Sequence, residues 1–306
     1  MSSVTGWMPG STPPERTLIT GAGGQLGRAL VRGAPAGVEL RACGREALDI
    51  GSLDAIAHRL DEFRPDLLIN AAAYTAVDRA EEDADAAFAI NAEAPGLLAR
   101  ACAARGVRLL HVSTDFVFDG RQSSPYAADA RSNPLGVYGA SKRAGEEAVL
   151  AADATALILR TGWVYSAGPG NFLSTMLRLH GERDELGVVA DQVGTPTAAG
   201  NLAAALWSFA ARPALAGIYH FSDAGVCSWY DFAQAIGEEA VALGLLKRAA
   251  RVKPIRSVDY PTPATRPPYS VLDKTTTWTD AAIEPQHWRE ALRRTLADLK
   301  QSTTEN

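Results

Sequence analysis

The chain is poor in cysteine, carries no basic excess and contains no long hydrophobic run. Its three cysteines, Cys43, Cys102 and Cys227, have neither paired nor metal-type spacing, which argues against a disulfide framework and suits a reducing compartment. The formal net charge of −5 argues against general nucleic-acid binding. No apolar stretch reaches the ~18 residues of a membrane span, and the polar residues 1–16 lack the apolar core of a signal peptide. These absences favour a cytoplasmic protein that has neither a membrane nor a nucleic acid as its partner.

Internal repeats and low-complexity tracts are also missing, and the remaining composition is that of an ordinary globular protein. Hydrophobic residues make up 47% and charged residues 21% of the 306 positions, enough for one or two domains. Alternating strand and helix patterns predict an α/β fold, a Rossmann-type doubly wound parallel sheet with a smaller, mixed α/β C-terminal substrate domain. The expected division is a flexible tail at 1–16, a dinucleotide-binding domain at 17–165 plus about 196–222, a substrate domain at about 166–195 plus 223–300, and a polar tail at 301–306.

Two segments within this outline carry more specific expectations. The alanine-rich stretch Asp78–Ala104 is predicted to be helical, with a break near Pro95. The segment Pro254–Pro268 is rich in proline yet carries Arg256 and Arg266. A long loop of this kind inside a compact domain is more often a binding loop than a spacer, so we expect it to contact a ligand. A rigid connector is the alternative.

A glycine-rich turn follows the first short strand. Gly21, Gly24 and Gly27 have the spacing G-x-x-G-x-x-G, and a helix is expected from Gln25, through Leu26, to Val31. Glycines permit a tight turn and a close approach of the backbone to a pyrophosphate, whose charge then meets the helix N-terminus. The spacing differs by one residue from the usual dinucleotide fingerprint. The turn therefore predicts a dinucleotide site by its placement as much as by its pattern.

The residues that follow the next two strands refine the expected cofactor. Many NAD-specific sites place an acidic residue after the second strand to hold the ribose diol, but this chain has Arg45 there. A guanidinium can bind a 2′-phosphate, which favours NADPH, while NADH stays open and a surface role for Arg45 is the alternative. Asp49 and Ile50 could border the adenine. The small side chains of Ala72 and Ala73 would let the cofactor lie against the backbone.

A candidate acid–base group stands further along the chain. Tyr138 and Lys142 are four residues apart, so a helix places them on one face, and Thr114 is expected to end a buried strand some two dozen residues earlier. A phenol has a pKa of about 10, and a neighbouring ammonium is expected to lower it, which suits general acid–base work. A Tyr-x-x-x-Lys pair alone occurs in many helices as a half-buried ring and a solvated amine. Its position behind the glycine turn favours the catalytic interpretation.

Longer stretches of the chain carry a family pattern. They are residues 24–27 (GQLG), 70–78 (NAAAYTAVD), 113–120 (STDFVFDG), 160–165 (RTGWVY) and 191–197 (DQVGTPT). Through them the chain, from about residue 17 to residue 299, resembles the extended short-chain dehydrogenase/reductases and, within that superfamily, the dTDP-4-dehydrorhamnose reductases. This resemblance implies NAD(P)H-dependent reduction of the 4-keto group of dTDP-4-dehydro-L-rhamnose to dTDP-L-rhamnose, the last step of dTDP-rhamnose biosynthesis.

The resemblance also implies roles for individual residues. Tyr138 would donate the proton to the 4-keto oxygen, Lys142 would hold the nicotinamide ribose and Thr114 would assist at the keto oxygen. The implied cofactor contacts are Gly24, Gln25, Leu26, Asp49, Ile50, Ala72, Ala73 and Thr75. The implied sugar-nucleotide contacts are Thr114, Asp115, Trp163, Asn171, Arg256 and Arg266. Among these, Arg266 is the strongest candidate for the phosphates, because a guanidinium grips phosphate with two hydrogen bonds.

One position departs from the family pattern. The resemblance implies tyrosine after Thr114-Asp115, where this chain has Phe116. If that hydroxyl contacts substrate, its loss removes a hydrogen bond worth ~0.5–1.5 kcal/mol, which should tune affinity or sugar preference without abolishing the chemistry. Related dehydratases carry a glutamate in the same slot, so Phe116 argues against a dehydratase.

Several alternatives stay open at this point. The chain could be another dTDP-4-keto-6-deoxysugar reductase, a sugar-nucleotide epimerase or dehydratase, or a non-catalytic NADP-binding regulatory subunit similar to those of methionine adenosyltransferase. The resemblance allows a Mg²⁺ ion at a subunit interface, but Glu182, Asp184 and Glu185 fit a solvated surface better, so no metal site is assigned. A homodimer, the stereochemical outcome and the downstream glycan also stay open.

Overall fold

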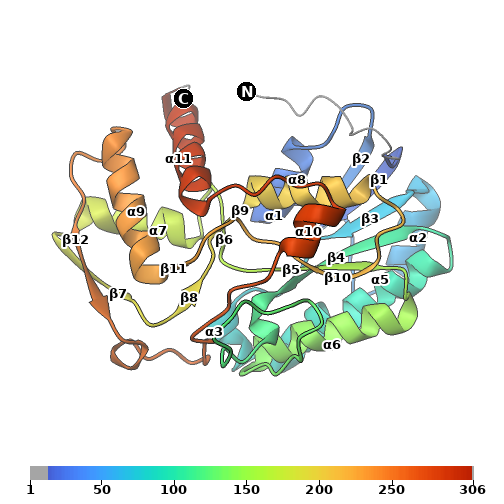
Figure 1. Cartoon of the computed structure of the whole chain (residues 1–306). Helices are drawn as coiled ribbons and strands as arrows, with labels where there is room; N and C mark the ends of the chain where they lie inside the picture. The colour runs from blue at the N-terminus through green and yellow to red at the C-terminus, as the bar shows by residue number, and fades with distance from the viewer. Residues whose placement is uncertain (1–12, 305–306) are drawn as a thin grey trace.

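A six-stranded parallel sheet forms the centre of the molecule (Figure 1). The computed structural model describes residues 13–304, so most of the expected N-terminal tail lies outside the described residues. The strand order is β10-β5-β4-β3-β1-β2. The strands are β1 (Arg16–Thr20), β2 (Glu39–Cys43), β3 (Leu67–Asn70), β4 (Arg108–Thr114), β5 (Leu157–Thr161) and β10 (Gly217–His220). This order confirms the predicted doubly wound sheet, whose ligand crevice lies at the carboxyl ends of the strands where the order reverses.

Helices cover both faces of this sheet, because its strands present apolar side chains to both sides. Leu18 and Ile19 are neighbours on β1, and they belong to separate core clusters on opposite faces. One face is covered by α1 (Gln25–Arg32) and α8 (Ala199–Ala210), which lie side by side above the sheet in Figure 1. The other is covered by α2 (Leu53–Phe63), α5 (Ala94–Ala103) and α6 (Val137–Ala152). The sheet is therefore buried like that of other parallel α/β folds.

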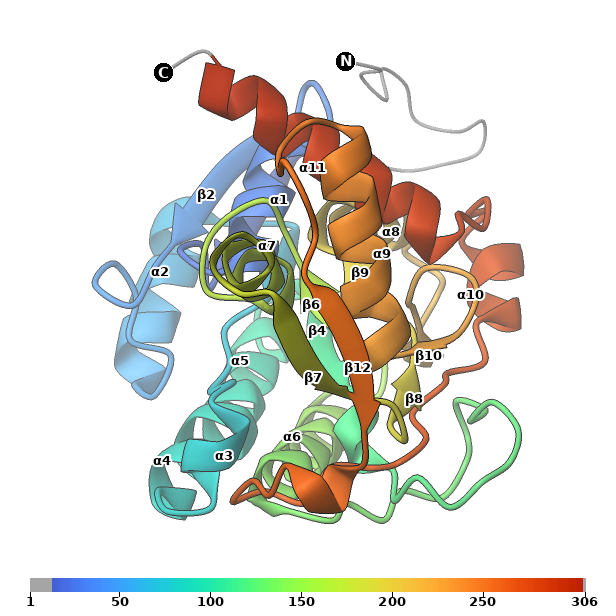
Figure 2. The ribbon, with the colours of Figure 1, turned by 90° about the vertical axis from the view of Figure 1, so that its left-hand side faces the viewer.

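A second region of short sheets and helices lies beside the carboxyl ends of the central strands (Figure 2). Its core cluster includes Tyr165, Leu173, Phe232 and Leu292. The paired strands are β6 (Val164–Tyr165) with β9 (Thr197–Ala198), β7 (Glu185–Val189) with β12 (Arg251–Ile255), and β8 (Val193–Gly194) with β11 (Cys227–Ser228). The helices are α7 (Phe172–Glu182), α9 (Trp229–Ala242) and α11 (Trp288–Thr304), whereas α10 (Thr275–Asp280) packs against β10 at the edge of the central sheet.

The alanine-rich stretch 78–104 differs from its prediction in where it breaks. The break lies at residues 81–83, between α3 (Val77–Ala80) and α4 (Ala84–Phe88). Pro95 lies in the first turn of α5, which continues from α4 through a π-helical turn, η1 (Ala89–Glu93). A proline removes one intrahelical donor, and a π turn, which changes the hydrogen-bond register, accommodates that loss without ending the helix.

Two further boundaries also differ from expectation. The predicted polar tail 301–306 is helical as far as Thr304, because α11 continues to that residue, and residues 305–306 lie outside the described part. The segment Pro254–Pro268 begins inside β12 and contains a short 3₁₀ turn, η3 (Ser257–Asp259), before it becomes a loop. Within residues 13–304, no helix combines the length and the hydrophobicity that a membrane span requires.

Candidate active site

The strand β4 ends at Thr114, as predicted, and a 3₁₀ turn, η2 (Asp115–Val117), follows it. The buried Thr114 hydroxyl accepts the Phe116 N–H at 3.2 Å and donates to Asp115 Oδ1 at 3.1 Å. Burial raises the pKa of Asp115 to about 6, although hydrogen bonds from Ser270 and Thr114 oppose that rise. A hydroxyl and a carboxyl group thus lie together at the edge of the sheet, where they can bind a carbonyl oxygen or a sugar hydroxyl.

Tyr138 and Lys142 lie one turn apart on α6, whose first turn packs against η2. This approach needs Gly139, because a Cβ there would collide with the carbonyl oxygen of Phe116. The Thr114 hydroxyl lies beside the Tyr138 phenol. The Phe116 and Tyr138 rings meet edge to face, with centroids 5.5 Å apart and planes at 75°. The structure thus brings Thr114, Tyr138 and Lys142 to the same end of β4.

The pKa of Tyr138 differs from its prediction. Burial raises this pKa to about 12, against the lowering effect of the Thr114 hydroxyl and with a contribution from Asp115 in the same direction as burial. The predicted lowering by Lys142 is wrong for this state, because Lys142 Nζ donates to the Val112 carbonyl oxygen at 2.7 Å. Burial in turn lowers the pKa of Lys142 to about 8. Tyr138 therefore holds its proton at neutral pH.

The glycine turn between β1 and α1 has the geometry that a phosphate requires. Gly21 has a φ of +69°, and a Cβ there would lie 2.6 Å from Ala72 N. A Cβ at Gly27 would collide with the Gly21 carbonyl oxygen. Gly24 is the N-cap of α1 and offers no side-chain hydrogen bond, so the N–H groups at Gln25 and the next residues lack a side-chain cap. An uncapped helix N-terminus approached by bare backbone is a suitable place for an anion.

The expected adenine-side residues lie next to this turn. The Ala22 N–H donates to the Cys43 carbonyl oxygen at 3.1 Å, which joins the glycine turn to the end of β2. Arg45 follows at an exposed position. Asp49 is also exposed and accepts a backbone N–H through Oδ1, whereas Ile50 is buried in the core. Arg45 and Asp49 are therefore the two of these side chains that can reach a ligand.

A buried asparagine that the sequence analysis missed ties the loop after β3 to α6. Asn91, in η1, accepts the Tyr74 N–H at 2.8 Å and donates to the Tyr74 carbonyl oxygen at 3.0 Å. Its amide also donates to Ser141 Oγ at 3.1 Å, and that hydroxyl donates to the Tyr138 carbonyl oxygen at 2.9 Å. Tyr74 is thus linked through Asn91 to Ser141 on α6. The only sequence signal was a polar residue in an otherwise alanine-rich helical segment.

An aromatic pocket lies beside Asp115 and Phe116. Trp163 stacks on Trp229, with centroids 3.6 Å apart and planes at 5°, and the Trp163 backbone has the unusual φ of +51°. Strain of this kind is concentrated at functional sites. Between the lining side chains lies a small, partly open space of about 30 Å³. The lining residues are Phe116, Trp163, Gln192, Trp229, Arg266, Pro267 and Ser270. Trp229 and Ser270 were missed, because nothing local distinguishes them from core residues.

The two predicted phosphate-binding arginines are placed differently. Arg266 lines the aromatic pocket and forms two hydrogen bonds with Asp78, at 2.9 and 2.7 Å. The hydrogen bond from Arg266 is the largest cause that holds the pKa of Asp78 below its ordinary value. Arg256 is 72% exposed, pairs with Asp259 at 3.0 Å and does not line the pocket. Asp78 belongs to α3, so Arg266 ties the loop after η3 to the central domain.

Asn171 has a capping contact that the sequence analysis did not anticipate. It is the N-cap of α7, where its side chain accepts the Ser174 N–H at 3.1 Å. Its amide nitrogen donates to Gln25 Oε1 at 2.9 Å and to the carbonyl oxygens of Ser166 and Gly168. Both ends of the amide are therefore occupied, and they link α7 to the start of α1. The expected nucleotide contact of Asn171 stays a prediction.

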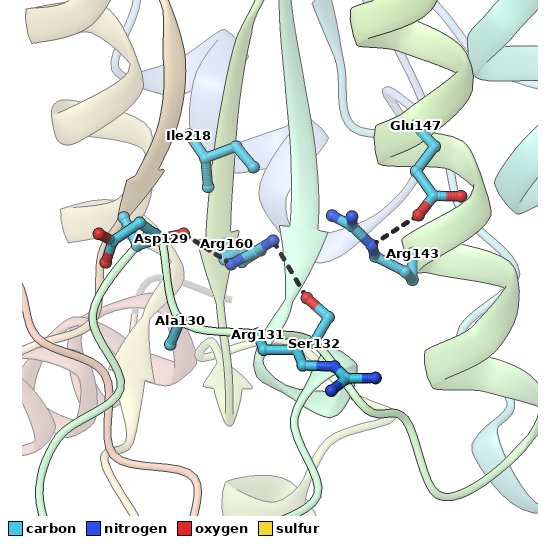
Figure 3. Close-up of a pocket in the computed structure, with 9 residues that line it drawn as sticks. Asp129, Ala130, Arg131, Ser132, Arg143, Glu147, Arg160 and Ile218 are labelled. Carbon is cyan, nitrogen blue, oxygen red and sulfur yellow. Dashed lines mark hydrogen bonds and ion pairs between the residues drawn. The ribbon is translucent and has the colours of Figure 1, made fainter.

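A buried ion pair supports the end of β4. Arg160 on β5 donates to both oxygens of Glu146 at 2.8 and 2.7 Å, and Ser113 Oγ donates to Glu146 at 2.6 Å. The two charged side chains are 1% and 0% exposed. Figure 3 shows Arg160 reaching Ser132 at the rim of an open cavity of about 440 Å³, where Arg143 pairs with Glu147. The pair holds Ser113, the residue before Thr114, and so supports the position of Thr114 in the site.

The acidic residues considered for a metal are paired with basic side chains. Glu182 pairs with Arg178 at 2.7 Å, Asp184 with Arg248 at 2.6 Å and Glu185 with Lys253 at 2.5 Å. Within the described residues, no three His, Cys, Asp or Glu side chains gather as a metal-binding group. The Mg²⁺ expectation therefore gains no support from this cluster.

Comparison with known proteins agrees with this geometry. The family model described as the RmlD substrate binding domain matches residues 15–301. The chain is 44% identical to a dTDP-4-dehydrorhamnose reductase of Aggregatibacter actinomycetemcomitans, over 91% of this chain and 97% of that protein.

Two solved structures are also similar over most of the chain. The dTDP-4-dehydrorhamnose reductase of Clostridium acetobutylicum superposes with a TM-score of 0.87 at 38% identity, covering 93% of this chain and 99% of that one. The enzyme of the same name from Bacillus anthracis, solved in complex with NADP, has a TM-score of 0.87 at 34% identity, with coverage of 93% and 99%. The chain therefore belongs to the dTDP-4-dehydrorhamnose reductase family, and it is an oxidoreductase.

Proposed function

We propose that this chain reduces the 4-keto group of dTDP-4-dehydro-L-rhamnose to dTDP-L-rhamnose, with NADPH as the preferred reductant. The observation that carries the proposal is the position of Tyr138 beside Thr114, at the sheet edge where the glycine turn also lies. A keto group bound at this edge would have the Tyr138 phenol as its proton donor on one side, and the cofactor crevice would lie on the other side. The NADP complex of the Bacillus anthracis relative supports the choice of cofactor.

The residues around the glycine turn fit a dinucleotide. The uncapped N-terminus of α1 would take the pyrophosphate, and Gly21, Gly24 and Gly27 leave room for its approach. Arg45 would pair with the 2′-phosphate. We assign the remaining cofactor contacts to Gln25, Leu26, Asp49, Ala72, Ala73 and Thr75, and to the backbone of Ile50, whose side chain is buried in the core. Bound there, the reduced nicotinamide supplies the hydride for the carbonyl carbon.

The acid–base residues supply the proton. Tyr138 donates its phenolic proton to the oxygen that becomes the new hydroxyl, because a pKa of about 12 keeps that proton on the phenol until charge develops. Thr114 orients the carbonyl oxygen through its hydroxyl. Lys142, an ammonium below its pKa of about 8, stabilises the phenolate left on Tyr138. This preorganised charge accounts for much of the rate.

The sugar nucleotide is assigned to the aromatic pocket. Asp115 would bind a sugar hydroxyl, Trp163 would pack against the sugar nucleotide, and Arg266 would exchange Asp78 for a phosphate. This pocket is partly open to solvent, so the sugar nucleotide would extend out of it, and a phosphate would reach Arg266 once that side chain leaves Asp78. We therefore assign cofactor binding to residues 17–165 plus about 196–222, and substrate binding to about 166–195 plus 223–300.

The test is NADPH oxidation in the presence of dTDP-4-dehydro-L-rhamnose generated in the reaction mixture, with NADH in a parallel series. Rapid oxidation that depends on the sugar nucleotide, with dTDP-L-rhamnose as the product, supports the proposal. The proposal fails if the folded protein binds NADPH but oxidises none of it when any 4-keto-6-deoxysugar nucleotide is added. That outcome would favour the regulatory-subunit alternative, for which a co-purifying partner is the positive sign.

Arg45 is predicted to set the cofactor preference. Replacing it by alanine (Arg45→Ala) removes one exposed charge pair with the 2′-phosphate, worth about 1 kcal/mol, so the ratio of kcat/KM for NADPH to that for NADH should fall about fivefold. The steady-state constants with both cofactors provide the measurement. Arg32→Ala, at the far end of α1, is the matched control. An unchanged ratio in Arg45→Ala would show that Arg45 does not contact the 2′-phosphate.

Phe116 is predicted to tune substrate affinity. Phe116→Tyr places a hydroxyl at the pocket wall next to Tyr138, and one hydrogen bond to the sugar is worth ~0.5–1.5 kcal/mol. The KM for the sugar nucleotide should fall by roughly two- to tenfold, while kcat stays within about twofold. Steady-state kinetics decide the matter. A large loss of kcat would mean that the new hydroxyl disturbs Tyr138 and does not serve the substrate.

A further inference from the structure

A chain of buried polar side chains crosses the sheet beneath Lys142. Thr20 Oγ1 on β1 donates to Asn70 Oδ1 on β3 at 2.6 Å, and Asn70 Nδ2 lies 2.9 Å from His111 Nδ1 on β4. His111 Nε2 then lies 3.4 Å from Lys142 Nζ. Asn70 and His111 are 1% and 0% exposed, so bulk water does not supply alternative partners. The direction of each hydrogen bond in this chain therefore matters.

A backbone amide fixes that direction. The Ala72 N–H lies 3.2 Å from Asn70 Oδ1, and a backbone N–H can only donate. The Asn70 oxygen must therefore face Ala72 and Thr20, which turns the Asn70 amide nitrogen toward His111. An amide nitrogen also only donates, so His111 Nδ1 has to be the acceptor. A neutral imidazole that accepts at Nδ1 carries its proton on Nε2.

The proton on Nε2 points at Lys142. The Lys142 side chain is 2% exposed, and it donates to the Val112 carbonyl oxygen at 2.7 Å. A neutral amine could accept the His111 Nε2–H with its lone pair. An ammonium has only donors, so it meets the imidazole N–H donor to donor.

We propose that His111 is a positioning residue for Lys142. Its Nε2–H, whose place is set by Ala72 through Asn70, faces the Lys142 amine and disfavours the protonated form of that amine. The ammonium is therefore held less firmly and can move during the reaction. The part concerning the reaction rests on the proposed role of Lys142. The opposition itself depends only on the buried contacts. It leaves the lysine free to turn from Val112 toward the phenolate of Tyr138 once charge develops there.

The other charged groups around Lys142 do not replace this effect. Along α6, Tyr138 is neutral at physiological pH, and Glu146 is held by Arg160 of β5 while its charge raises the pKa of Lys142. Burial and the neighbouring Lys142 charge keep the pKa of His111 well below its ordinary value, consistent with a neutral ring. The imidazole N–H is thus the neighbouring group from β4 that acts against the ammonium.

The tautomer can be read directly by long-range proton–nitrogen correlation NMR on isotope-labelled enzyme. His111, assigned with a His111→Gln variant, should show the Nε2–H form between about pH 6 and pH 9. His220 provides the internal contrast, because its Nδ1 faces the Tyr126 carbonyl oxygen and must donate, which makes it the Nδ1–H form. An Nδ1–H or doubly protonated His111 overturns the proposal.

A near-isosteric variant of Asn70 reverses the direction of the hydrogen bonds from residue 70 to Lys142. In Asn70→Asp, a carboxylate oxygen replaces the donor that faces His111, so the ring should switch to the Nδ1–H form and Nε2 should accept from Lys142. The Lys142 titration, followed by its Cε chemical shift, should then move up by about one pH unit or more. Thr20→Val is the matched control, because Ala72 still orients the Asn70 amide. It should change neither the tautomer nor the titration.

Asn70→Asp also adds a negative charge. Measuring both the His111 tautomer and the Lys142 titration separates the effect of that charge from the effect of the tautomer. A Lys142 shift without the tautomer switch, or a switch without the shift, overturns the proposal. In turnover assays the alkaline limb of kcat/KM should move with the Lys142 titration in Asn70→Asp and stay in place in Thr20→Val. If no sugar nucleotide is turned over, the proposed function fails, while the two NMR readouts still decide the role of His111.

Discussion

Replacing Tyr138 by phenylalanine is expected to lower kcat by about 10²–10⁴-fold while the dissociation constant for NADPH stays nearly unchanged. The variant loses only the phenolic hydroxyl, so the ring still meets Phe116 edge to face and α6 still packs on η2. What disappears is the proton donor beside Thr114. Tyr138 as a whole is partly exposed, but desolvation of its phenol is the main cause that raises its pKa to about 12.

Single-turnover rates and NADPH binding, measured on the same preparation, check this prediction. Tyr219→Phe is the matched control, since it removes a tyrosine hydroxyl bonded to Asp280 at the edge of the sheet, and its turnover should stay near that of the native chain. Wild-type-like turnover in Tyr138→Phe would end the assignment of Tyr138 as the acid. An equal loss in both variants would point to destabilisation of the fold and not to the chemistry.

Breaking the buried pair of Arg160 and Glu146 is expected to have the largest effect on stability. Arg160→Met leaves the Glu146 carboxylate buried with Ser113 and Arg143 as its remaining partners, which should cost about 3–5 kcal/mol of unfolding free energy. The double replacement Arg160→Met with Glu146→Leu should recover much of this loss, because no charge is then buried. Urea unfolding followed by circular dichroism measures both.

The surface pair of Arg178 and Glu182 is the matched control. Its side chains are 59% and 53% exposed, so Arg178→Met should cost less than about 1 kcal/mol. If Arg160→Met proved no more costly than Arg178→Met, the buried pair would not stabilise the fold.

The same pair predicts an acid dependence with a definite sign. Burial raises the pKa of Glu146, but Arg160, Ser113 and Arg143 outweigh it, so the folded-state pKa lies below the ordinary value of 4.5. A carboxyl with a lowered folded-state pKa contributes stability above its unfolded value and loses it as pH falls through the folded one. The native chain should therefore lose unfolding free energy relative to the double variant as the pH falls below about 4.5.

Much of the candidate site could be predicted because its signals are local. The spacing of Gly21, Gly24 and Gly27 dictates a turn, and the four-residue spacing of Tyr138 and Lys142 dictates one helical face. Thr114 ends β4 two residues after the last apolar side chain of that strand, Val112. Each of these depends on neighbours within a few residues, where backbone geometry alone sets the outcome.

Other features depend on residues far apart in the sequence. Trp229 reaches Trp163 and Asn91 reaches Tyr74 only through the folded chain, and no local period announces either contact. The helix break at residues 81–83 was missed for the same reason, since helix propensity is weak compared with tertiary packing.

The residue pattern predicted the alternation of strands and helices around a parallel sheet, the glycine turn, and the grouping of Thr114, Tyr138 and Lys142. The pKa values of Tyr138 and Lys142, in contrast, depend on the tertiary structure. Lys142 was expected to lower the pKa of Tyr138, yet its ammonium donates to the Val112 carbonyl oxygen while burial raises the pKa of the phenol. The reason is physical: spacing along a helix sets which side chains share a face, whereas desolvation and hydrogen-bond direction depend on everything packed against that face.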